Sequence, residues 1–193
     1  MKYCSDCGSA ELAATDDGRG NVRRFDCRRC GARHSCNPRL LACCIAEWSG
    51  QVLLCRRAGE PGPGLWALPG GYVEACEPVQ AAAARGARQQ AGAVVDDLAL
   101  FRVYNLPKCN EVIAVFRGQL RDGRFNAGGE ARAATLFPKR DLPWEQLASE
   151  SSRAALHDYA TRRWQATYAS PVEDLVWLQP PARLQGPTLR GLR

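Results

Sequence analysis

Two hydrophobic patterns dominate the middle of the chain. The runs LLACCIAEW (40–48) and QVLLCRR (51–57) are apolar and strand-like, and the Ser49-Gly50 pair between them favours a turn. We therefore predict a β-hairpin here. An alanine-rich segment follows from about Pro78 to Ala91, with proline at its start and Gly92 after its end, which are the usual signals for the two ends of a helix. Together with the preceding PGG turn, these segments predict a strand, a loop and a helix, and ESSRAALHDYATRRW (150–164) predicts another helix.

The amino-terminal segment has a different pattern. A turn sequence, DDGRGN (16–21), precedes the alternating stretch VRRFDC (22–27), which predicts a hairpin. Around it, two CxxC pairs are separated by nineteen residues: Cys4, Cys7, Cys27 and Cys30. Such spacing lets two tight turns present four thiolates to one tetrahedral Zn²⁺, so we predict a zinc ribbon. Its zinc is expected to be structural because all four ligand positions are taken, and His34 is not expected to bind it. The alternative is four unliganded cysteines in a reduced protein.

Length and composition limit the class of protein. A chain of 193 residues holds one ordinary domain plus a small module. Its hydrophobic fraction of 46% and charged fraction of 24% are typical of globular proteins and argue against disordered or fibrous classes. The first residues lack the pattern of a signal peptide, and no apolar run of about 18 residues occurs. Six further cysteines are scattered among apolar neighbours, which favours a reducing compartment, so we expect a cytoplasmic protein with no membrane association.

The net charge of +6 is modest and unevenly distributed. Arginines make the amino-terminal module basic, which raises nucleic-acid binding as an alternative. However, few aromatic side chains accompany them, so platforms for stacking bases are missing and we do not expect a nucleic-acid partner. Residues 179–193 are basic and rich in proline and glycine, which predicts a mobile or surface-draped tail.

At four positions the central segment resembles the signature of the Nudix family, G-x5-E-x7-R-E-U-x-E-E-x-G-U, where U is aliphatic. Gly71, Glu77, Arg85 and Gly92 fill its glycine, glutamate, arginine and closing glycine without a gap. HSCNPRLL, YNLP and DLPWEQLA also resemble a subgroup of Nudix proteins that carry a zinc ribbon. The resemblance implies an α/β fold, a Nudix α/β/α sandwich with a mixed sheet, preceded by the zinc ribbon. The domains would be the ribbon (1–38), the Nudix domain (39–178) and the tail (179–193).

The same alignment shows three departures. Gly86, Gln89 and Gln90 stand where the family has glutamates that hold Mg²⁺ or Mn²⁺ near a substrate pyrophosphate. Magnesium is usually anchored by carboxylates, and glutamine offers only a neutral carbonyl oxygen. The predicted helix also contains arginines and no acidic residue, so its field favours anions. We expect that this helix does not bind catalytic Mg²⁺.

Other acidic residues are candidates for chemistry. Glu74 and Glu77 lie in the loop before the helix, Glu111 lies on a later strand and Glu130 lies in the loop GRFNAGGEARAA, where the family often has another acidic residue. We take Glu74, Glu77 and Glu130 as candidate catalytic residues; alternatively, each is a solvated surface charge. For Glu77 the resemblance implies a structural role, an ion pair with Arg85 that clamps the loop to the helix.

Candidate ligand-binding residues follow from the family analogy. The resemblance implies that Arg57 and Trp66 help to hold a phosphate and a base or ring, whereas packing is the alternative role for both. The other candidates lie on the helix: Arg85, Gln89 and Gln90. Ser151, Ser152 and His157 are expected to face solvent because their spacing does not suit a serine–histidine pair.

Three classes of function remain open. The zinc-ribbon subgroup implies a pyrophosphohydrolase acting on NADH, ADP-ribose or FAD. The lost carboxylates favour instead a cleft without metal-dependent hydrolysis: a nucleotide-binding or regulatory protein, or a metal-independent isomerase, cyclase or lyase. In each case the expected partner is a small molecule, either a nucleotide or another phosphorylated compound, and the family resemblance implies a homodimer.

Overall fold

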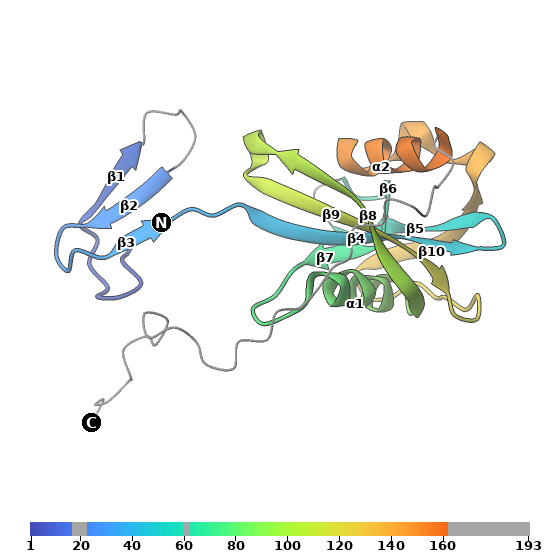
Figure 1. The fold of residues 1–193 in the computed structure, drawn as a ribbon, viewed down its shortest axis with the longest axis horizontal. Coiled ribbons are helices and arrows are strands. Elements are labelled where there is room, and N and C mark those ends of the chain that lie inside the picture. The colour runs from blue at the N-terminus through green and yellow to red at the C-terminus, as the bar shows by residue number, and fades with distance from the viewer. Residues whose placement is uncertain (17–22, 60–61, 162–193) are drawn as a thin grey trace, which may run out of the picture.

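A computed structural model describes residues 1–16, 23–59 and 62–161 of the protein. Figure 1 shows a small sheet near the amino terminus and a larger body of strands and helices. The predicted tail, the predicted boundary at residue 178, most of the turn at 16–21 and the end of the predicted helix 150–164 lie outside the described residues.

The amino-terminal module is an antiparallel sheet with the order β1-β2-β3. Its strands are β1 (Leu12–Asp16), β2 (Arg23–Cys27) and β3 (Arg33–Ser35). The pairing of β1 with β2 confirms the predicted hairpin between the two CxxC pairs.

The main sheet has the order β10-β5-β4-β9-β8, with β6 paired to β5 and β7 paired to β4. The strands are β4 (Arg39–Trp48), β5 (Gln51–Arg57), β6 (Trp66–Ala67), β7 (Gly70–Tyr72), β8 (Val95–Leu106), β9 (Glu111–Leu120) and β10 (Ala131–Pro138). β4 and β9 are parallel and the other pairs are antiparallel, so the sheet is mixed. Ser49 and Gly50 both have positive φ, the backbone that a two-residue hairpin turn requires.

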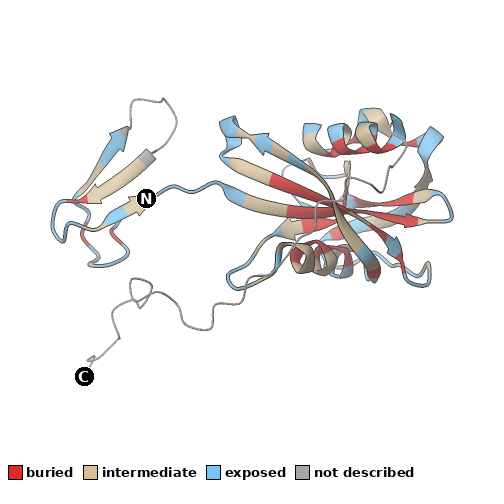
Figure 2. Ribbon diagram, in the orientation of Figure 1, coloured by how far each residue is buried: buried red, intermediate tan, exposed pale blue. Residues whose placement is uncertain are grey.

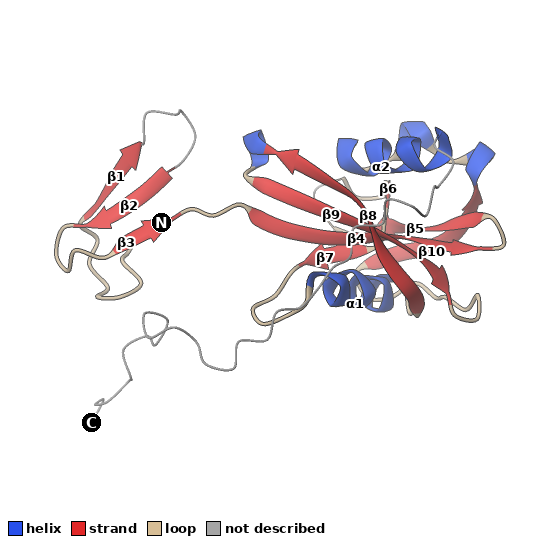
Figure 3. Cartoon of the chain, in the orientation of Figure 1, coloured by secondary structure: helices blue, strands red, loops and turns tan. Residues whose placement is uncertain are grey.

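Two helices cover opposite faces of this sheet, which confirms the predicted α/β/α sandwich (Figure 3). They are α1 (Val79–Ala91) and α2 (Glu150–Thr161), and three short 3-10 turns lie at Pro107–Cys109, Lys139–Asp141 and Trp144–Gln146. α1 ends as predicted at Gly92, whose φ of 57° lets its N–H reach back to the carbonyl of Arg88. No helix in the described segments is long and apolar enough to cross a membrane.

Strand β4 separates two cores. Its residues alternate, so Ala42 and Cys44 face α1 while Cys43 and Ile45 face α2. Because both faces are covered, β4 is a nearly continuous apolar run instead of an alternating one. Figure 2 shows the buried positions concentrated in the strands between the helices.

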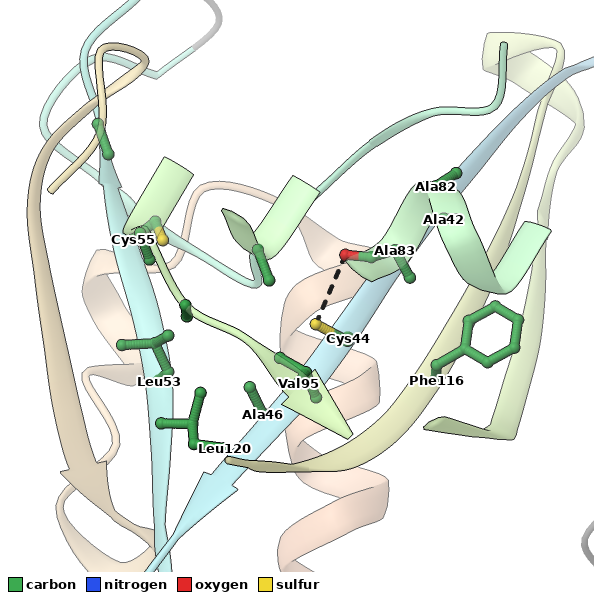
Figure 4. Close-up of a cluster of buried hydrophobic side chains, with 14 of the residues drawn as sticks. Ala42, Cys44, Ala46, Leu53, Cys55, Ala82, Ala83, Val95, Phe116 and Leu120 are labelled. Carbon is green, nitrogen blue, oxygen red and sulfur yellow. Dashed lines mark hydrogen bonds between the residues drawn. The ribbon is translucent and has the colours of Figure 1, made fainter. Parts of the chain in front are cut away.

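The core beneath α1 is built largely from small side chains. Ala82 and Ala83 of α1 lie over Ala42 and Cys44 of β4 (Figure 4), and the Cys44 thiol donates to the Ala83 carbonyl at 3.9 Å. Small residues on both sides bring the helix close to the sheet. This close approach determines the geometry of the candidate site.

A buried carboxylate fixes α2. Glu47 of β4 is 6% exposed and accepts hydrogen bonds from the Arg117 guanidinium of β9 and, at 2.7 Å, from the Tyr159 hydroxyl of α2. Burial and the neighbouring Glu47 both raise the pKa of Tyr159. The ion pair with Arg117 compensates for burying the charge, and the hydrogen bond from Tyr159 holds α2 against β4.

Candidate functional site

The loop from Val73 to Pro78 is clamped to α1 by one ion pair. Arg85 donates to both carboxylate oxygens of Glu77, at 2.7 and 2.8 Å, and also to the Tyr72 carbonyl at 2.8 Å. The backbone N–H of Glu74 donates to Glu77 at 3.0 Å. Glu77 therefore has the geometry of a structural clamp, and Glu74 contributes only a longer contact of 3.5 Å to Arg85, with a side chain 69% exposed.

Gly86 lies against the backbone of β7. A Cβ at this position would come within 2.5 Å of both the Cα and the carbonyl carbon of Gly70, which is closer than real Cβ atoms approach other atoms. The obstruction is backbone, which cannot rotate away as a side chain can. Glycine at position 86 therefore allows the helix to touch β7, and a glutamate could not be placed here unless the helix moved.

Gln90, one helical turn later, binds the same residue. Its side-chain Nε2 donates to the Gly70 carbonyl at 2.9 Å, and its Oε1 accepts from the Gly70 N–H at 3.3 Å. The Gly70 N–H needs an acceptor and its C=O needs a donor, so the backbone determines which end of the amide is nitrogen. Nε2 also lies 3.4 Å from Oε2 of Glu130.

Gln89 points elsewhere. It is exposed, and its Oε1 accepts from the Arg85 guanidinium at 3.1 Å. Thus two of the three positions that depart from the signature contact Gly70, while the third extends the clamp around Arg85.

A cavity of about 450 Å³ opens beside Gln90. Its wall combines apolar residues of the sheet with polar groups, among them Arg57 of β5, Gln90, Glu130 and the serines at the start of α2. Arg57 and Glu130 place opposite charges on this wall, and the hydroxyl groups add further donors. The cavity can therefore hold a small ligand that has an apolar part and a polar or anionic part.

The prediction that Ser151 and Ser152 face solvent is wrong. Ser151 and Ser152 line the cavity, and Ser152 is only 7% exposed, whereas the sequence predicted that they face solvent. The Ser149 hydroxyl caps the start of α2 by accepting from the Ser152 N–H at 3.2 Å. The signal in the sequence was the serine cluster before a helix; His157 is exposed as expected.

Arg57 and Trp66 have separate environments. Arg57 lines the cavity, as a ligand-binding role requires. Trp66 instead packs edge-on against Phe137 with ring centroids 5.0 Å apart, and the Arg56 guanidinium lies 5.9 Å from its ring. The geometry favours the packing role for Trp66.

The remaining acidic residues do not form one cluster. Glu111, on β9, accepts from the Tyr72 hydroxyl at 2.7 Å and from Arg39 at 2.5 Å, whereas Glu130 lies in the loop before β10. Across residues 1–16, 23–59 and 62–161, groups of three or more potential metal ligands within 4.8 Å of one another occur only in the amino-terminal module. The carboxylates of Glu74, Glu77 and Glu130 therefore do not converge on one cation.

The amino-terminal cysteines do converge. The ligand atoms of Cys4, Cys7, Cys27 and Cys30 lie within 4.8 Å of one another, and two of the sulfur pairs are 3.6 Å apart. A tetrahedral zinc ion with bonds of about 2.3 Å separates its thiolates by about 3.8 Å, so the cluster can hold such a metal. None of the ten cysteines of the chain forms a disulfide.

The two halves of this cluster have the same backbone. In each, the residue after CxxC is glycine with φ near 72–73°, and its N–H donates to the first cysteine carbonyl at 2.9 Å: Gly8 to Cys4 and Gly31 to Cys27. Burial opposes ionisation of Cys4, but backbone N–H groups and His34 more than offset it and lower its pKa to about 6. These hydrogen-bond donors favour the thiolate, which is the form of cysteine that binds a cation.

A pH titration tests the structural role of Glu77. The Arg85 guanidinium and the Glu74 N–H lower the pKa of this carboxyl from 4.5 to about 2. A lowered folded-state pKa contributes stability above the unfolded value and loses it as pH falls through the folded value. Glu77→Gln is therefore expected to reduce the loss of stability between pH 4.5 and about 2, measured by urea unfolding at each pH. An unchanged pH profile would contradict the clamp. Glu145→Gln, on an exposed turn, is the control.

Substitution of Gly86 tests the close approach of α1. In an open helical position, Gly86→Ala would raise stability by about 1 kcal/mol through helix propensity. Here we expect the opposite, a loss of about 1–3 kcal/mol in the free energy of unfolding, because the methyl group meets the Gly70 backbone. Gly129→Ala is the control, since nothing lies within 4 Å of its added Cβ. A stabilised Gly86→Ala protein would show that the helix can move away freely.

Comparison with known proteins identifies the family. A model of the NUDIX domain matches residues 38–159. The ADP-ribose pyrophosphatase of Methanocaldococcus jannaschii is 32% identical over 124 residues, which cover 62% of this chain and 70% of that protein. The structure of a NUDIX hydrolase from Nitrosomonas europaea aligns with a TM-score of 0.76 at 35% identity, over 83% of this chain and 90% of that one. A MutT NUDIX hydrolase from Burkholderia pseudomallei aligns with a TM-score of 0.54 at 27% identity, over 63% of this chain and 97% of that one. The chain belongs to the Nudix family.

Proposed function

We propose that this protein binds a nucleoside-diphosphate ligand of the ADP-ribose type in the cavity beside Gln90, and that it does not hydrolyse the ligand by the Mg²⁺-dependent route of its family. The observation that carries the proposal is the contact of α1 with Gly70. Gly86 and Gln90 occupy two of the three positions where the family has metal-binding glutamates, and both are committed to contacts with this backbone. Nudix enzymes generally use Mg²⁺, and the residues here do not fit that cation.

The charge of the site supports an anionic ligand. α1 has no acidic residue, and Arg85 and Arg88 lie along it. Arg57 reaches the cavity wall from β5. A guanidinium binds phosphate oxygens through several donors, so Arg57 is the residue we assign to the pyrophosphate.

The choice of ligand class comes from the relative with a named activity. The archaeal protein is an ADP-ribose pyrophosphatase, and its similarity covers 62% of this chain. The apolar wall formed by Leu41, Leu68 and Ile113 suits a base or ring, while the polar wall suits the phosphate groups. NADH and FAD share the same diphosphate and are the next ligands to test.

Binding of ADP-ribose to the zinc-loaded protein decides this proposal. We expect calorimetry to give the same affinity with and without millimolar Mg²⁺, and chromatography to show intact ligand after prolonged incubation. Arg57→Ala should weaken binding by about tenfold or more, corresponding to roughly 1.4 kcal/mol.

The control is Arg56→Ala. Arg56 donates to the Gly64 carbonyl at 2.8 Å and lies near Trp66, outside the cavity, so its loss should leave the affinity unchanged. If AMP and ribose phosphate accumulate in a Mg²⁺-dependent manner at about 1 s⁻¹ or faster, the protein is a pyrophosphatase and the proposal is wrong. If no nucleotide of this class binds, the cleft has another ligand.

For the amino-terminal module we propose one structural Zn²⁺ bound by Cys4, Cys7, Cys27 and Cys30. The soft thiolates, the sulfur separations and the matched CxxCG backbones all suit this ion. The homodimer stays a prediction.

Metal analysis tests the zinc site. Protein purified without chelator should contain one zinc per chain, and chelation should abolish the ordered structure of the amino-terminal sheet while the Nudix domain stays folded. Cys7→Ser should lose most of the zinc, whereas Cys109→Ser, an exposed cysteine outside the cluster, should keep it. A zinc content below half an equivalent in the unmodified protein would refute the assignment.

A further inference from the structure

The side-chain amide nitrogen of Gln90 lies between two oxygen-bearing groups. Two oxygen atoms from different parts of the fold approach its Nε2: the Gly70 carbonyl at 2.9 Å and Oε2 of Glu130 at 3.4 Å. Backbone carbonyls and carboxylates are the ligands that hard divalent cations prefer. In this protein they receive the two hydrogens of a side-chain amide instead.

The backbone around this position is held firmly. The loop before Glu130 bonds to the end of α1, with the Asn126 N–H donating to the Ala91 carbonyl at 2.7 Å and the Gly128 N–H donating to the Gln90 carbonyl at 2.9 Å. Gly128 fits there because it has no Cβ, which would meet the Gln89 carbonyl. On the other side, Gly70 is fixed by its pairing with Cys43 in β4.

We propose that the amide nitrogen of Gln90 is a built-in substitute for a divalent cation, holding the Gly70 carbonyl and Glu130 together in a cleft that functions without metal. The proposal deepens the proposed function, because it says how the site keeps its shape without Mg²⁺, but it rests on the contacts of Gln90 and not on the identity of the ligand. Gln90 is a positioning residue for the cavity wall. Its NH₂ group donates one hydrogen bond to each of the two oxygen atoms. It thereby holds them near each other, as a cation bound to both would do.

A single substitution converts this arrangement into a test. Gln90→Glu removes the donor and leaves a third oxygen-bearing group facing the Gly70 carbonyl and Glu130. Without a cation the three groups repel one another, and with a cation they are its ligands. Mn²⁺ is the probe because it prefers oxygen, so the thiolates of the amino-terminal module do not compete strongly for it.

The measurement is made on the full-length, zinc-loaded protein in buffer freed of other divalent ions, with no nucleotide present. We expect Gln90→Glu to melt at a lower temperature than the unmodified protein, and Mn²⁺ to reverse that loss. Electron paramagnetic resonance of free Mn²⁺ should show that the variant binds the ion about tenfold more tightly, or better, than the unmodified protein.

Two further variants separate this idea from a simple effect of charge. Gln89→Glu adds the same charge one residue away, on an exposed side chain that contacts Arg85, and should show no Mn²⁺ response. The exchange variant Gln90→Glu/Glu130→Gln restores a donor opposite the new carboxylate, so it should melt at a higher temperature than Gln90→Glu and lose most of its Mn²⁺ binding.

The proposal is overturned if Gln90→Glu is as stable as the unmodified protein without Mn²⁺ and does not bind the ion. It is also overturned if Gln89→Glu responds to Mn²⁺ as strongly as Gln90→Glu, because charge alone would then explain both. Failure of ADP-ribose to bind has no bearing on these outcomes, so the two proposals can fail separately.

Discussion

The approach of α1 to the backbone of Gly70 is the contact on which the site depends. Gly86 permits the approach, because any Cβ at this position would collide with Gly70. Gln90 stabilises it by hydrogen bonding to both the N–H and the C=O of Gly70. The alanines beneath the helix also favour this approach, because their small side chains allow α1 to pack close to the sheet. With the helix this close, the amide of Gln90 reaches both the Gly70 carbonyl and Glu130.

The clamp around Arg85 is separate from this contact and explains what the sequence retains. Glu77 and Arg85 hold the loop to the helix, with the Tyr72 carbonyl as a third partner. This ion pair needs no metal, so it is equally useful whether the cleft hydrolyses a ligand or only binds it. Glu77 and Arg85, which match the signature, therefore maintain the shape of the loop. The changed positions, 86, 89 and 90, affect its capacity to bind a metal.

The sequence predicted the parts of the fold that local patterns determine. The apolar runs of β4 and β5, the turn at Ser49-Gly50 and the ends of α1 all follow from residue spacing and from glycine and proline at the boundaries. It could not predict that Gly86 and Gln90 share one partner, because that depends on how closely a helix packs on a strand sixteen residues earlier. The burial of Ser152 and the Glu47 ion pair were missed for the same reason, since each depends on contacts between segments far apart in the chain.

The contacts of positions 86 and 90 with Gly70 are coupled, so the glutamates of a metal site at these two positions cannot be replaced independently. If the helix first carried glutamate at both positions, replacing only the residue at 90 with glutamine would leave the helix too far away for the amide to reach Gly70, because the Cβ at 86 holds it back. Replacing only the residue at 86 with glycine would draw a carboxylate toward the Gly70 carbonyl, which repels it. Each change becomes favourable only with the other, so their effects on stability cannot be additive. A glutamate at 86 would have to displace a helix that the amide of Gln90 and the loop ending at Glu130 both hold in place. The loss of the metal site is therefore a change in packing as well as in charge, because a glutamate at position 86 cannot be restored without moving the helix away from Gly70.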